Sequence, residues 1–453
     1  MSAKPVIAIF DAGKTNKKLF LFDEQYRIVF ERTARFAEIT DEDGFACENV
    51  EALKVSVFDA LHEVGAMDEF EVKAINFSAY GASFVYLDET GQPLTPLYNY
   101  LKPYPPELQK QFYDTYGGEK EFSHQTASPV LGSLNSGMQL YRLKHENPDV
   151  FKRVKYALHL PQYLSYILTG KAVTDITSVG CHTNLWNFTK NDYHKWVKAE
   201  NIISKLPPIT PVDAVFKAKN GIKGCATGIG MHDSSAALMP YLVNFSEPFM
   251  LLSTGTWCIS LNPFNQEPLT SEELSADCLN YIQYNGKSVK ASRLFTGYEH
   301  EQESKRIAAH FNQSPAMYRT LTYKAQFMRD LPIVETGAEF KDIDLSAFKS
   351  GEHAYYSLIM HLVQKQYKSS MLVIAYTGIK RIFVDGGFSK NEIFMNLMAA
   401  CFPNIEVYAA SMAQASALGA ALVIHNTWNE QCLPSDLINL KYYTSKRAIK
   451  LGN

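Results

Sequence analysis

Two segments far apart in the chain share one pattern, and this repeat constrains the fold more than any other feature of the sequence. Residues 6–23 and 248–263 each contain an apolar run, a polar turn around a glycine and a second apolar run. The turns are Asp11-Ala12-Gly13 and Ser253-Thr254-Gly255. Turns rich in glycine and threonine present backbone N–H groups and hydroxyls, which suit a phosphate. The repeat predicts a duplicated domain with a nucleotide between the halves, and hence phosphoryl transfer.

The length and the strand pattern predict a two-domain α/β fold. A chain of 453 residues is too long for one hydrophobic core, so we expect two domains of roughly 200 residues each. Strand patterns alternate with helical ones, which indicates mixed sheets covered by helices. We place the boundary just before the second segment, giving domains of residues 1–243 and 244–453.

Further local patterns give specific expectations about secondary structure. One continuous helical pattern runs through residues 151–169, and a small-residue helix is expected at residues 415–421. Residues 262–291 and 313–351 are polar and irregular, and we expect insertions at a domain rim there.

Composition excludes several classes of function. A net charge of -3 gives no electrostatic basis for binding nucleic acid or an anionic membrane. No apolar run approaches the roughly 18 residues of a membrane span, and no signal peptide precedes the first strand. The seven cysteines are scattered without a CxxC, which favours a reducing compartment over a disulfide framework or a zinc site. We expect a cytoplasmic protein, and a homodimer is the default expectation for an oligomer.

The first turn is a candidate phosphate and metal site. Gly13-Lys14-Thr15 is not a Walker A loop, because Ala8 stands where that motif needs a glycine. The carboxylate of Asp11 is suited to hold Mg²⁺-bound phosphate. The residues expected to face the phosphates are Thr15, Asn16 and Lys18. A plain surface hairpin explains the same residues, since Asp is common in turns.

Asp233 is the candidate catalytic residue. It precedes a run of small residues that can begin a helix packed closely on a sheet. A carboxylate there can act as general base on a substrate hydroxyl. Alternatively, Asp233 caps the helix.

Two further turns are candidates for nucleotide binding. Ser253–Trp257 offers hydroxyls and N–H groups to phosphate oxygens, with a simple hairpin as the alternative. Asp385-Gly386-Gly387 joins a strand to a helix, and its glycines allow close approach to a ring or a ribose. The helix at 415–421 is expected to pack against this second turn.

Together these motifs resemble those of the FGGY carbohydrate kinases, in the same order and over nearly the whole chain. The matching segments are Asp11–Lys18, Leu87–Leu94, Leu168–Ser178, His232-Asp233, Ser253–Trp257 and Gly386–Asn391. The resemblance implies two ribonuclease H-like domains of the actin-like ATPase superfamily, with a cleft between them. It implies a phosphotransferase with an alcohol group as acceptor, which uses ATP and Mg²⁺.

The resemblance also assigns roles to residues. Asp233 is then the base and Asp11 the metal ligand. Phosphate contacts are expected from Gly13, Thr15, Asn16, Lys18, Thr254, Gly255 and Thr256. Gly386, Gly387 and Asn391 are expected to border the adenosine.

The sugar is expected to be a 6-deoxy-ketohexose, L-fuculose or L-rhamnulose, phosphorylated at O1. Tyr80-Gly81 and Gly255-Thr256-Trp257 resemble rhamnulokinases and fuculokinases, and aromatic rings suit a terminal methyl group. The expected substrate residues are Tyr80, Gly81, Ser83, His232, Asp233 and Trp257.

Departures from the family pattern keep other acceptors open. The family's aromatic-x-D-x-R segment is replaced by Tyr98–Lys102, and Ser83 stands where rhamnulokinases often have Asp. The alternatives are a pentulose (D-xylulose or L-ribulose), a polyol or glycerol. From another class, a catalytically silent sugar-binding or regulatory protein can use the same fold.

Overall fold

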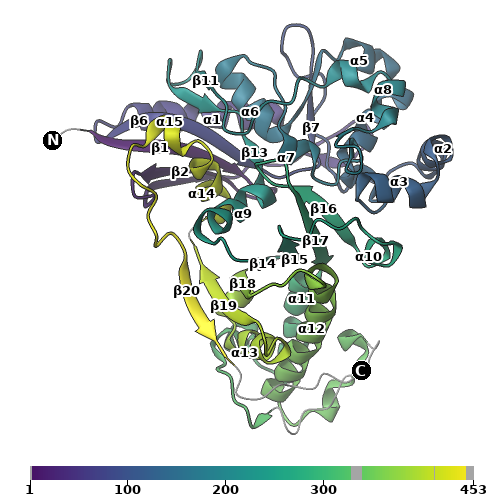
Figure 1. Ribbon diagram of the computed structural model, residues 1–453, viewed down its shortest axis with the longest axis vertical. Coiled ribbons are helices and arrows are strands. Elements are labelled where there is room, and N and C mark those ends of the chain that lie inside the picture. Colours follow the sequence, from purple (N-terminus) through teal and green to yellow (C-terminus); the bar gives the residue numbers. More distant parts are fainter. Residues whose placement is uncertain (1–2, 328–338, 413, 445–453) are drawn as a thin grey trace.

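Two large sheets, one in each half of the chain, dominate the computed structural model, which describes residues 3–327, 339–412 and 414–444. Each of the two sheets has seven strands. The sheet of the first half lies above that of the second half in Figure 1, and helix α9 (Asp233–Asn244) lies between them.

The first sheet is built around β1 (Lys4–Ala12), whose central residues are fully buried. β1 forms an antiparallel hairpin with β2 (Lys17–Asp23) and pairs in parallel with β6 (Phe70–Ala79). The sheet is completed by β3 (Ile28–Ala34), β11 (Val215–Lys217), β12 (Ala226–Gly228) and the short β13 (Met231–His232). Buried Val, Ile and Phe on both sides of these strands favour extended structure covered on two faces.

The second sheet repeats this arrangement around β14 (Phe249–Thr254). β14 forms an antiparallel hairpin with β15 (Cys258–Asn262) and pairs in parallel with β18 (Arg381–Gly386). The remaining strands are β16 (Cys278–Ile282), β17 (Ser288–Leu294), β19 (Glu406–Ser411) and β20 (Asn439–Tyr443). The two sheets follow the same order of pairings. In each, the central strand of the hairpin pairs in parallel with a second strand, this second strand pairs in parallel with a third, and the third pairs with an antiparallel edge strand. This is the duplication predicted from the two segments.

Helices cover both faces of each sheet, and short strands lie outside the sheets. The helices are α1 (Val50–Gly65), α2 (Pro106–Tyr116), α3 (Glu119–Thr126), α4 (Ser136–Glu146), α5 (Pro148–Arg153), α6 (Leu160–Thr169), α7 (Ile176–Val179), α8 (Lys195–Ala199), α9, α10 (Ser271–Ser275), α11 (Thr296–His310), α12 (Gly351–Ile374), α13 (Glu392–Cys401), α14 (Ala415–Leu422) and α15 (His425–Trp428). Short two-stranded pairings join β4 (Ile39–Thr40) to β5 (Ala46–Cys47), β7 (Phe84–Leu87) to β8 (Tyr156–His159), and β9 (Trp186–Asn187) to β10 (Asp192–Tyr193). The 3₁₀ turns include η1 (Gly132–Leu134) and η7 (Phe388–Lys390).

Helix α9 contributes to the cores on both of its sides. Its residues Ala236 and Met239 pack into the core of the first sheet, with Ile7 and Phe20 among their neighbours. Its residues Leu238 and Tyr241 pack into the core of the second sheet. The first residue of this helix, Asp233, therefore lies where the two halves of the molecule meet.

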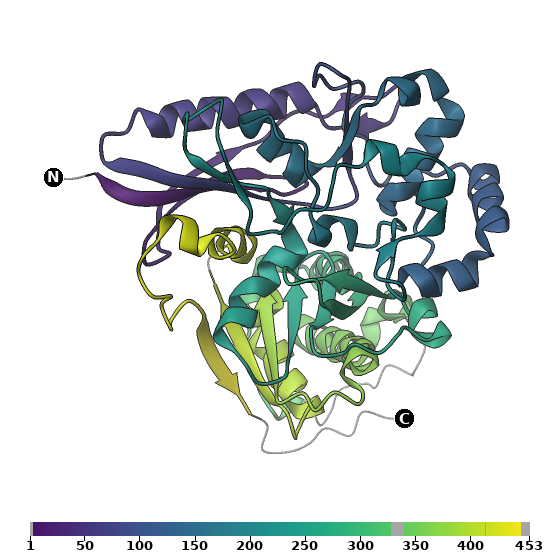
Figure 2. The ribbon, with the colours of Figure 1, turned by 45° about the horizontal axis from the view of Figure 1, so that its top comes forward.

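The small-residue helix α14 packs elsewhere than expected. It lies against the first sheet and α9, and not against the turn at residues 385–387 (Figures 1 and 2). A Cβ on Gly419 would lie only 1.8 Å from the carbonyl oxygen of Ala236, so the two helix backbones are in close contact. Asn76 on β6 also donates to the carbonyl of Ala420 at 2.7 Å. The small residues of α14 therefore allow close packing of this helix against α9 and against the first sheet.

Two other local expectations are corrected. Residues 151–169 do not form one helix, because β8 separates α5 from α6 and pairs with β7. Residues 262–291 are not irregular, since they contain α10, β16 and the start of β17. The buried Lys290 of β17 is paired with Glu273 at 2.9 Å, and such buried polar residues disguise the strand pattern. The expected insertion at 313–351 includes residues 328–338, which lie outside the described residues.

Among the described residues, no helix is both long enough and apolar enough to cross a membrane.

Candidate active site

Asp233 occupies the first turn of α9 as a buried carboxylate. Its Oδ1 accepts a hydrogen bond from the Ser234 backbone N–H at 2.6 Å. The cap position belongs to His232, and no side chain caps this helix in the usual way. Burial raises the pKa of Asp233 to about 6, although 33% of its side chain stays exposed. A carboxylate whose pKa lies close to neutral pH, and which a ligand can reach, has the properties of a general base.

His232 packs beside the carboxylate of Asp233. Its Nε2 lies 3.0 Å from the Cys181 thiol sulfur and 3.2 Å from Asp233 Oδ1. Its ring stacks on Tyr281 from the second half, with centroids 5.6 Å apart. Burial lowers the pKa of His232 to about 3, so the imidazole is neutral. Its Nδ1 has no hydrogen-bond partner among the described residues.

Asp11 at the end of β1 forms the second carboxylate of the site. Its Oδ2 accepts a hydrogen bond from Ser416 Oγ of α14 at 2.9 Å. Burial, together with the nearby charge of Asp233, raises the pKa of Asp11 to about 6. Two partly buried carboxylates, one of which raises the pKa of the other, are a suitable setting for a divalent cation. The chemistry of the residues present fits Mg²⁺, and Asp11 as its ligand stays a prediction.

The tip of the first hairpin is tight and largely exposed. A Cβ on Gly13 would lie 3.2 Å from the carbonyl oxygen of Asn16, which shows how closely the turn is closed. Thr15 is exposed, and Asn16 accepts a hydrogen bond from Arg35 at 2.7 Å. Lys18 pairs with Glu31 of β3 at 2.8 Å. Lys18 is thus engaged at the sheet surface, and Thr15 is the freer polar side chain of this turn.

The second hairpin turn is tied to the glycine turn after β18. The Thr254 hydroxyl donates to the carbonyl of Asp385 at 2.5 Å and accepts from the N–H of Phe388 at 3.0 Å. Gly386 has a φ of 89°, and a Cβ there would lie 2.0 Å from the Thr254 carbonyl oxygen. The Thr254 hydroxyl therefore joins the two turns, and a phosphate contact by Thr254 stays a prediction. Thr256 is exposed, whereas the Gly255 N–H already donates to the carbonyl of Trp257 at 2.9 Å.

A pocket of about 490 Å³ opens beside these two turns. It is lined on one side by Gly255, Gly387 and Asn391, all of them predicted nucleotide residues. The Asn391 amide donates to the Tyr355 hydroxyl at 2.9 Å and caps α13 through its oxygen. The pocket has the size and the mixed aromatic and polar lining of a small-molecule site. An adenosine fits this chemistry.

Several residues that line this pocket were not identified from the sequence. They are Gly297, His300, Tyr318, Leu321 and Tyr355. Tyr318 and Tyr355 stack with centroids 4.7 Å apart, although 37 positions separate them in the chain. Phe388 and Lys390 also line the pocket, and both lie inside the matched segment Gly386–Asn391.

The expected sugar residues lie on both sides of Asp233. Gly81 touches His232 so closely that a Cβ there would lie 2.9 Å from its ring. Tyr80 packs edge-on against Tyr100, with centroids 5.9 Å apart. Ser83 is buried, and its hydroxyl has no partner within the described part of the chain. Trp257, from the second half, is 43% exposed and lies under the Arg293 guanidinium.

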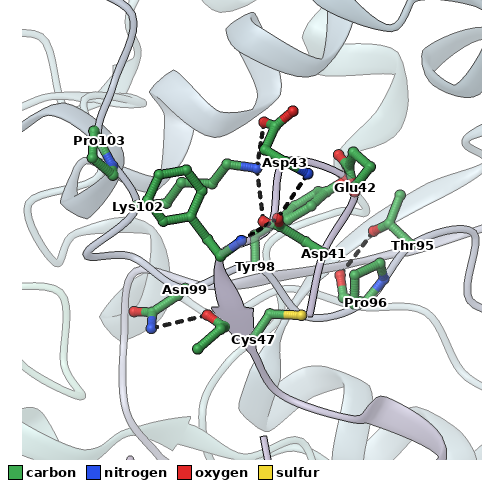
Figure 3. Close-up of polar contacts among 12 residues, drawn as sticks. Asp41, Glu42, Asp43, Cys47, Thr95, Pro96, Tyr98, Asn99, Lys102 and Pro103 are labelled. Carbon is green, nitrogen blue, oxygen red and sulfur yellow. Dashed lines mark hydrogen bonds and ion pairs between the residues drawn. The ribbon is translucent and has the colours of Figure 1, made fainter. Parts of the chain in front are cut away.

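The segment Tyr98–Lys102 that departs from the family pattern is held by an ion-pair cluster. Lys102 lies between Asp41 and Asp43, at 2.7 Å from each (Figure 3). Burial opposes ionisation of Asp41, but the bond from Lys102 and backbone N–H groups still lower its pKa. Tyr100 in the same segment packs edge-on against Tyr80, and burial and the charge of Asp233 raise its pKa. This segment therefore offers a tyrosine to the acceptor site, while its lysine is used structurally.

Comparison with protein families identifies both halves of the chain. Residues 6–232 match the N-terminal domain of the FGGY family of carbohydrate kinases. Residues 246–431 match the carbohydrate kinase FGGY C-terminal domain. The chain therefore belongs to the FGGY family of carbohydrate kinases, which confirms the family and the enzyme class predicted from its motifs.

Individual relatives agree with the family assignment but do not determine the sugar substrate. A rhamnulokinase from Halalkalibacterium halodurans is 27% identical over 189 residues, and the match spans 42% of this chain and 39% of that protein. A carbohydrate kinase from Novosphingobium aromaticivorans has a TM-score of 0.79 at 22% identity, covering 98% of this chain and 94% of its own. A ligand-bound xylulose kinase from Lactobacillus acidophilus has a TM-score of 0.80 at 18% identity, covering 97% and 94%. These structures confirm the two-domain fold.

Proposed function

We propose that this protein transfers the γ-phosphoryl group of ATP to a hydroxyl of a ketose, with Asp233 as the general base. The observation that carries this proposal is the position of Asp233 at the start of α9. The same helix reaches the nucleotide turn about 12 Å further on, where Tyr241 donates to Asp385 at 3.3 Å. One rigid element thus connects the acceptor side of the site with the nucleotide side.

In this mechanism Asp233 takes the proton of the acceptor hydroxyl as its oxygen attacks the γ-phosphorus. The bond from phosphorus to the β-phosphate oxygen breaks, and ADP leaves with that electron pair. Phosphoryl transfer needs mainly positioning and charge neutralisation, so one carboxylate and backbone-rich turns are sufficient. Neutral His232 adds no positive charge beside the base, which keeps Asp233 a proton acceptor near pH 7.

Asp11 would hold Mg²⁺, which supplies the positive charge that phosphate oxygens require. The Ser416 hydroxyl orients one oxygen of Asp11 and leaves the other for the metal. Gly13, Thr15 and Thr256 would contact phosphate through backbone or exposed hydroxyl groups, and Gly255 would allow the phosphate to approach the turn closely. Gly386, Gly387 and Asn391 would border the adenosine, with Tyr355 behind the Asn391 amide.

We propose a 6-deoxy-ketohexose, phosphorylated at O1, as the acceptor. Support comes from the partial similarity to a rhamnulokinase and from the aromatic residues Tyr80, Tyr100 and Trp257 around the site. Aromatic rings favour a terminal methyl over a hydroxymethyl group. Tyr80, Gly81, Ser83 and His232 would surround the sugar.

For this choice of acceptor we expect kcat/KM for L-rhamnulose or L-fuculose to exceed that for D-xylulose, L-ribulose and glycerol by at least about tenfold. A buried methyl group in an apolar pocket gives discrimination of roughly 10–200-fold. The measurement is ADP release with each acceptor under identical Mg·ATP. A higher kcat/KM for a pentulose or polyol would replace the deoxy-ketohexose and leave the kinase assignment standing.

The acid side of the pH profile is expected to report Asp233. Because burial raises its pKa to about 6, the base is protonated and inactive below that value. We expect kcat/KM for the sugar to fall about tenfold per pH unit below pH 6 and to level off above it. At saturating Mg²⁺, which would keep Asp11 ionised, the residual activity of Asp233→Asn should lack this acid limb. An identical limb in the variant would assign the titration to another group.

A further inference from the structure

The loop expected to contact the sugar has an unusual backbone conformation. Residues 80–83 connect β6 to β7, and Ala82 within this loop has a φ of 60°. A residue with a Cβ rarely adopts this left-handed region, because it is sterically unfavourable. Ala82 is also buried. A strained conformation of this kind persists only where the surroundings impose it.

Gln139 of α4 supplies such a constraint. Its side-chain amide donates two hydrogen bonds, to the carbonyl of Ala82 at 2.7 Å and to that of Ser133 at 2.6 Å. Two carbonyl acceptors can be satisfied only by the NH₂ group, which fixes the orientation of the amide. Gln139 is only 7% exposed, so these bonds are shielded from water. Its Oε1 has no partner among the described residues.

The helix that carries Gln139 is itself firmly anchored. Asn135 donates to the carbonyl of His182 at 2.8 Å, and the N–H of Gly137 donates to the carbonyl of Thr183 at 2.8 Å. A Cβ on Gly137 would lie 2.6 Å from the same Thr183 oxygen. The start of α4 is therefore in close backbone contact with residues 182–183. The neighbouring Cys181 contacts His232, so residues 181–183 support both α4 and the residue next to Asp233.

The other side of the loop touches the catalytic residues. The N–H of Tyr80 donates to the carbonyl of Ala12 at 3.2 Å, next to Asp11. Gly81 lies against the ring of His232. The loop is thus confined between the first hairpin, the start of α9 and the Gln139 amide. Loss of the amide would release only the last of these constraints.

We propose that Gln139 is a positioning residue for sugar recognition: its amide holds the Ala82 carbonyl and thereby fixes the loop of residues 80–83 against His232. This inference rests on the proposed sugar kinase activity. Gln139 acts through the loop and not by touching the transferred phosphate. Its removal therefore affects the sugar and leaves the nucleotide pocket, which lies in the second half, unchanged.

The test compares Michaelis constants of Gln139→Leu and Gln139→Glu with those of the wild type. We expect both variants to raise the KM for the best ketose by ten- to hundredfold, the range for a small misplacement of binding groups. The KM for ATP should change less than about twofold. Gln139→Glu is nearly isosteric, so it preserves packing while removing the NH₂ donor.

The choice of two variants distinguishes positioning from direct contact. A glutamate keeps an acceptor oxygen, so a normal sugar KM in Gln139→Glu would mean that Oε1 and not the NH₂ group is what matters, and would overturn the proposal. Gln366→Leu is the matched control. This equally buried glutamine in α12 also donates two bonds, to Ser260 and Ser370, and also leaves Oε1 without a described partner.

The remaining outcomes are also decisive. Equal increases in both Michaelis constants, or a sugar KM raised as much by Gln366→Leu, would reduce Gln139 to a general structural role and overturn the proposal. A wild type that phosphorylates no acceptor would instead overturn the proposed function. Thermal denaturation of every variant identifies those that fail to fold, and Gln139→Glu then carries the comparison.

Discussion

Asp233→Asn is expected to lower kcat by about 10²–10⁴-fold, the range for loss of a general base. Asn has nearly the same shape and can still accept the hydrogen bond from the Ser234 N–H. It also removes a charge whose burial is unfavourable, as the raised pKa of Asp233 indicates. The fold and ATP binding should therefore persist. The measurement is single-turnover phosphoryl transfer, with nucleotide affinity determined separately.

Asp59→Asn is the control for Asp233→Asn, since Asp59 is an exposed carboxylate on α1. We expect it to retain full activity. If Asp233→Asn loses stability while activity per folded molecule stays unchanged, Asp233 serves only the helix, and the base must be sought elsewhere.

Gly419→Ala is expected to lower both the stability and the activity of the protein. The new Cβ would lie 1.8 Å from the Ala236 carbonyl oxygen, so α14 and α9 must separate. Alanine gains about 1 kcal/mol in helix propensity, whereas overpacking against backbone costs about 3 kcal/mol or more. The expected net loss in the free energy of unfolding is about 2 kcal/mol.

The same displacement should reach the active site. Helix α9 begins at Asp233, and α14 supplies Ser416 to Asp11. A shift of about 1 Å between them is expected to lower kcat by roughly tenfold to a hundredfold. Urea denaturation and steady-state kinetics measure the two effects.

Gly65→Ala is the matched control for Gly419→Ala, because a Cβ there meets only Ile222, at 3.9 Å. It should be neutral or slightly stabilising. If Gly419→Ala behaves like Gly65→Ala, the close contact between α14 and α9 does not hold the site together.

The fold was largely predictable because its strongest signals are local. The central strands are buried on both sides, so they appear in the sequence as apolar runs, and the repeated hairpin turns identify the duplication. The failures arise where tertiary contacts override local pattern. Lys290 looks like a surface residue, but its partner Glu273 allows it to lie buried in β17, the strand next to the sheet edge. Alanine and glycine in α14 indicate close packing, but they do not show that the packing partner is α9, almost two hundred positions earlier in the chain.

The site was predictable where chemistry requires one residue type at a motif position. Asp11 and Asp233 are of this kind, and both are partly buried carboxylates whose pKa values burial raises to about 6. Tyr318 and Tyr355 line the nucleotide pocket from separate elements, so no local pattern marks them. No sequence pattern marks Gln139 either, because its two hydrogen-bond partners are backbone carbonyls that come close to it only in the folded protein.

The central claim is that Asp233 enables phosphoryl transfer from ATP to a sugar. The most direct test incubates the wild type with Mg·ATP and each ketose or polyol, and follows sugar phosphate formation by phosphorus NMR together with ADP. The account predicts one new sugar phosphate resonance that grows in step with ADP and is lost in Asp233→Asn. ATP binding without phosphate transfer to any acceptor would contradict it and would favour a catalytically silent sugar-binding protein.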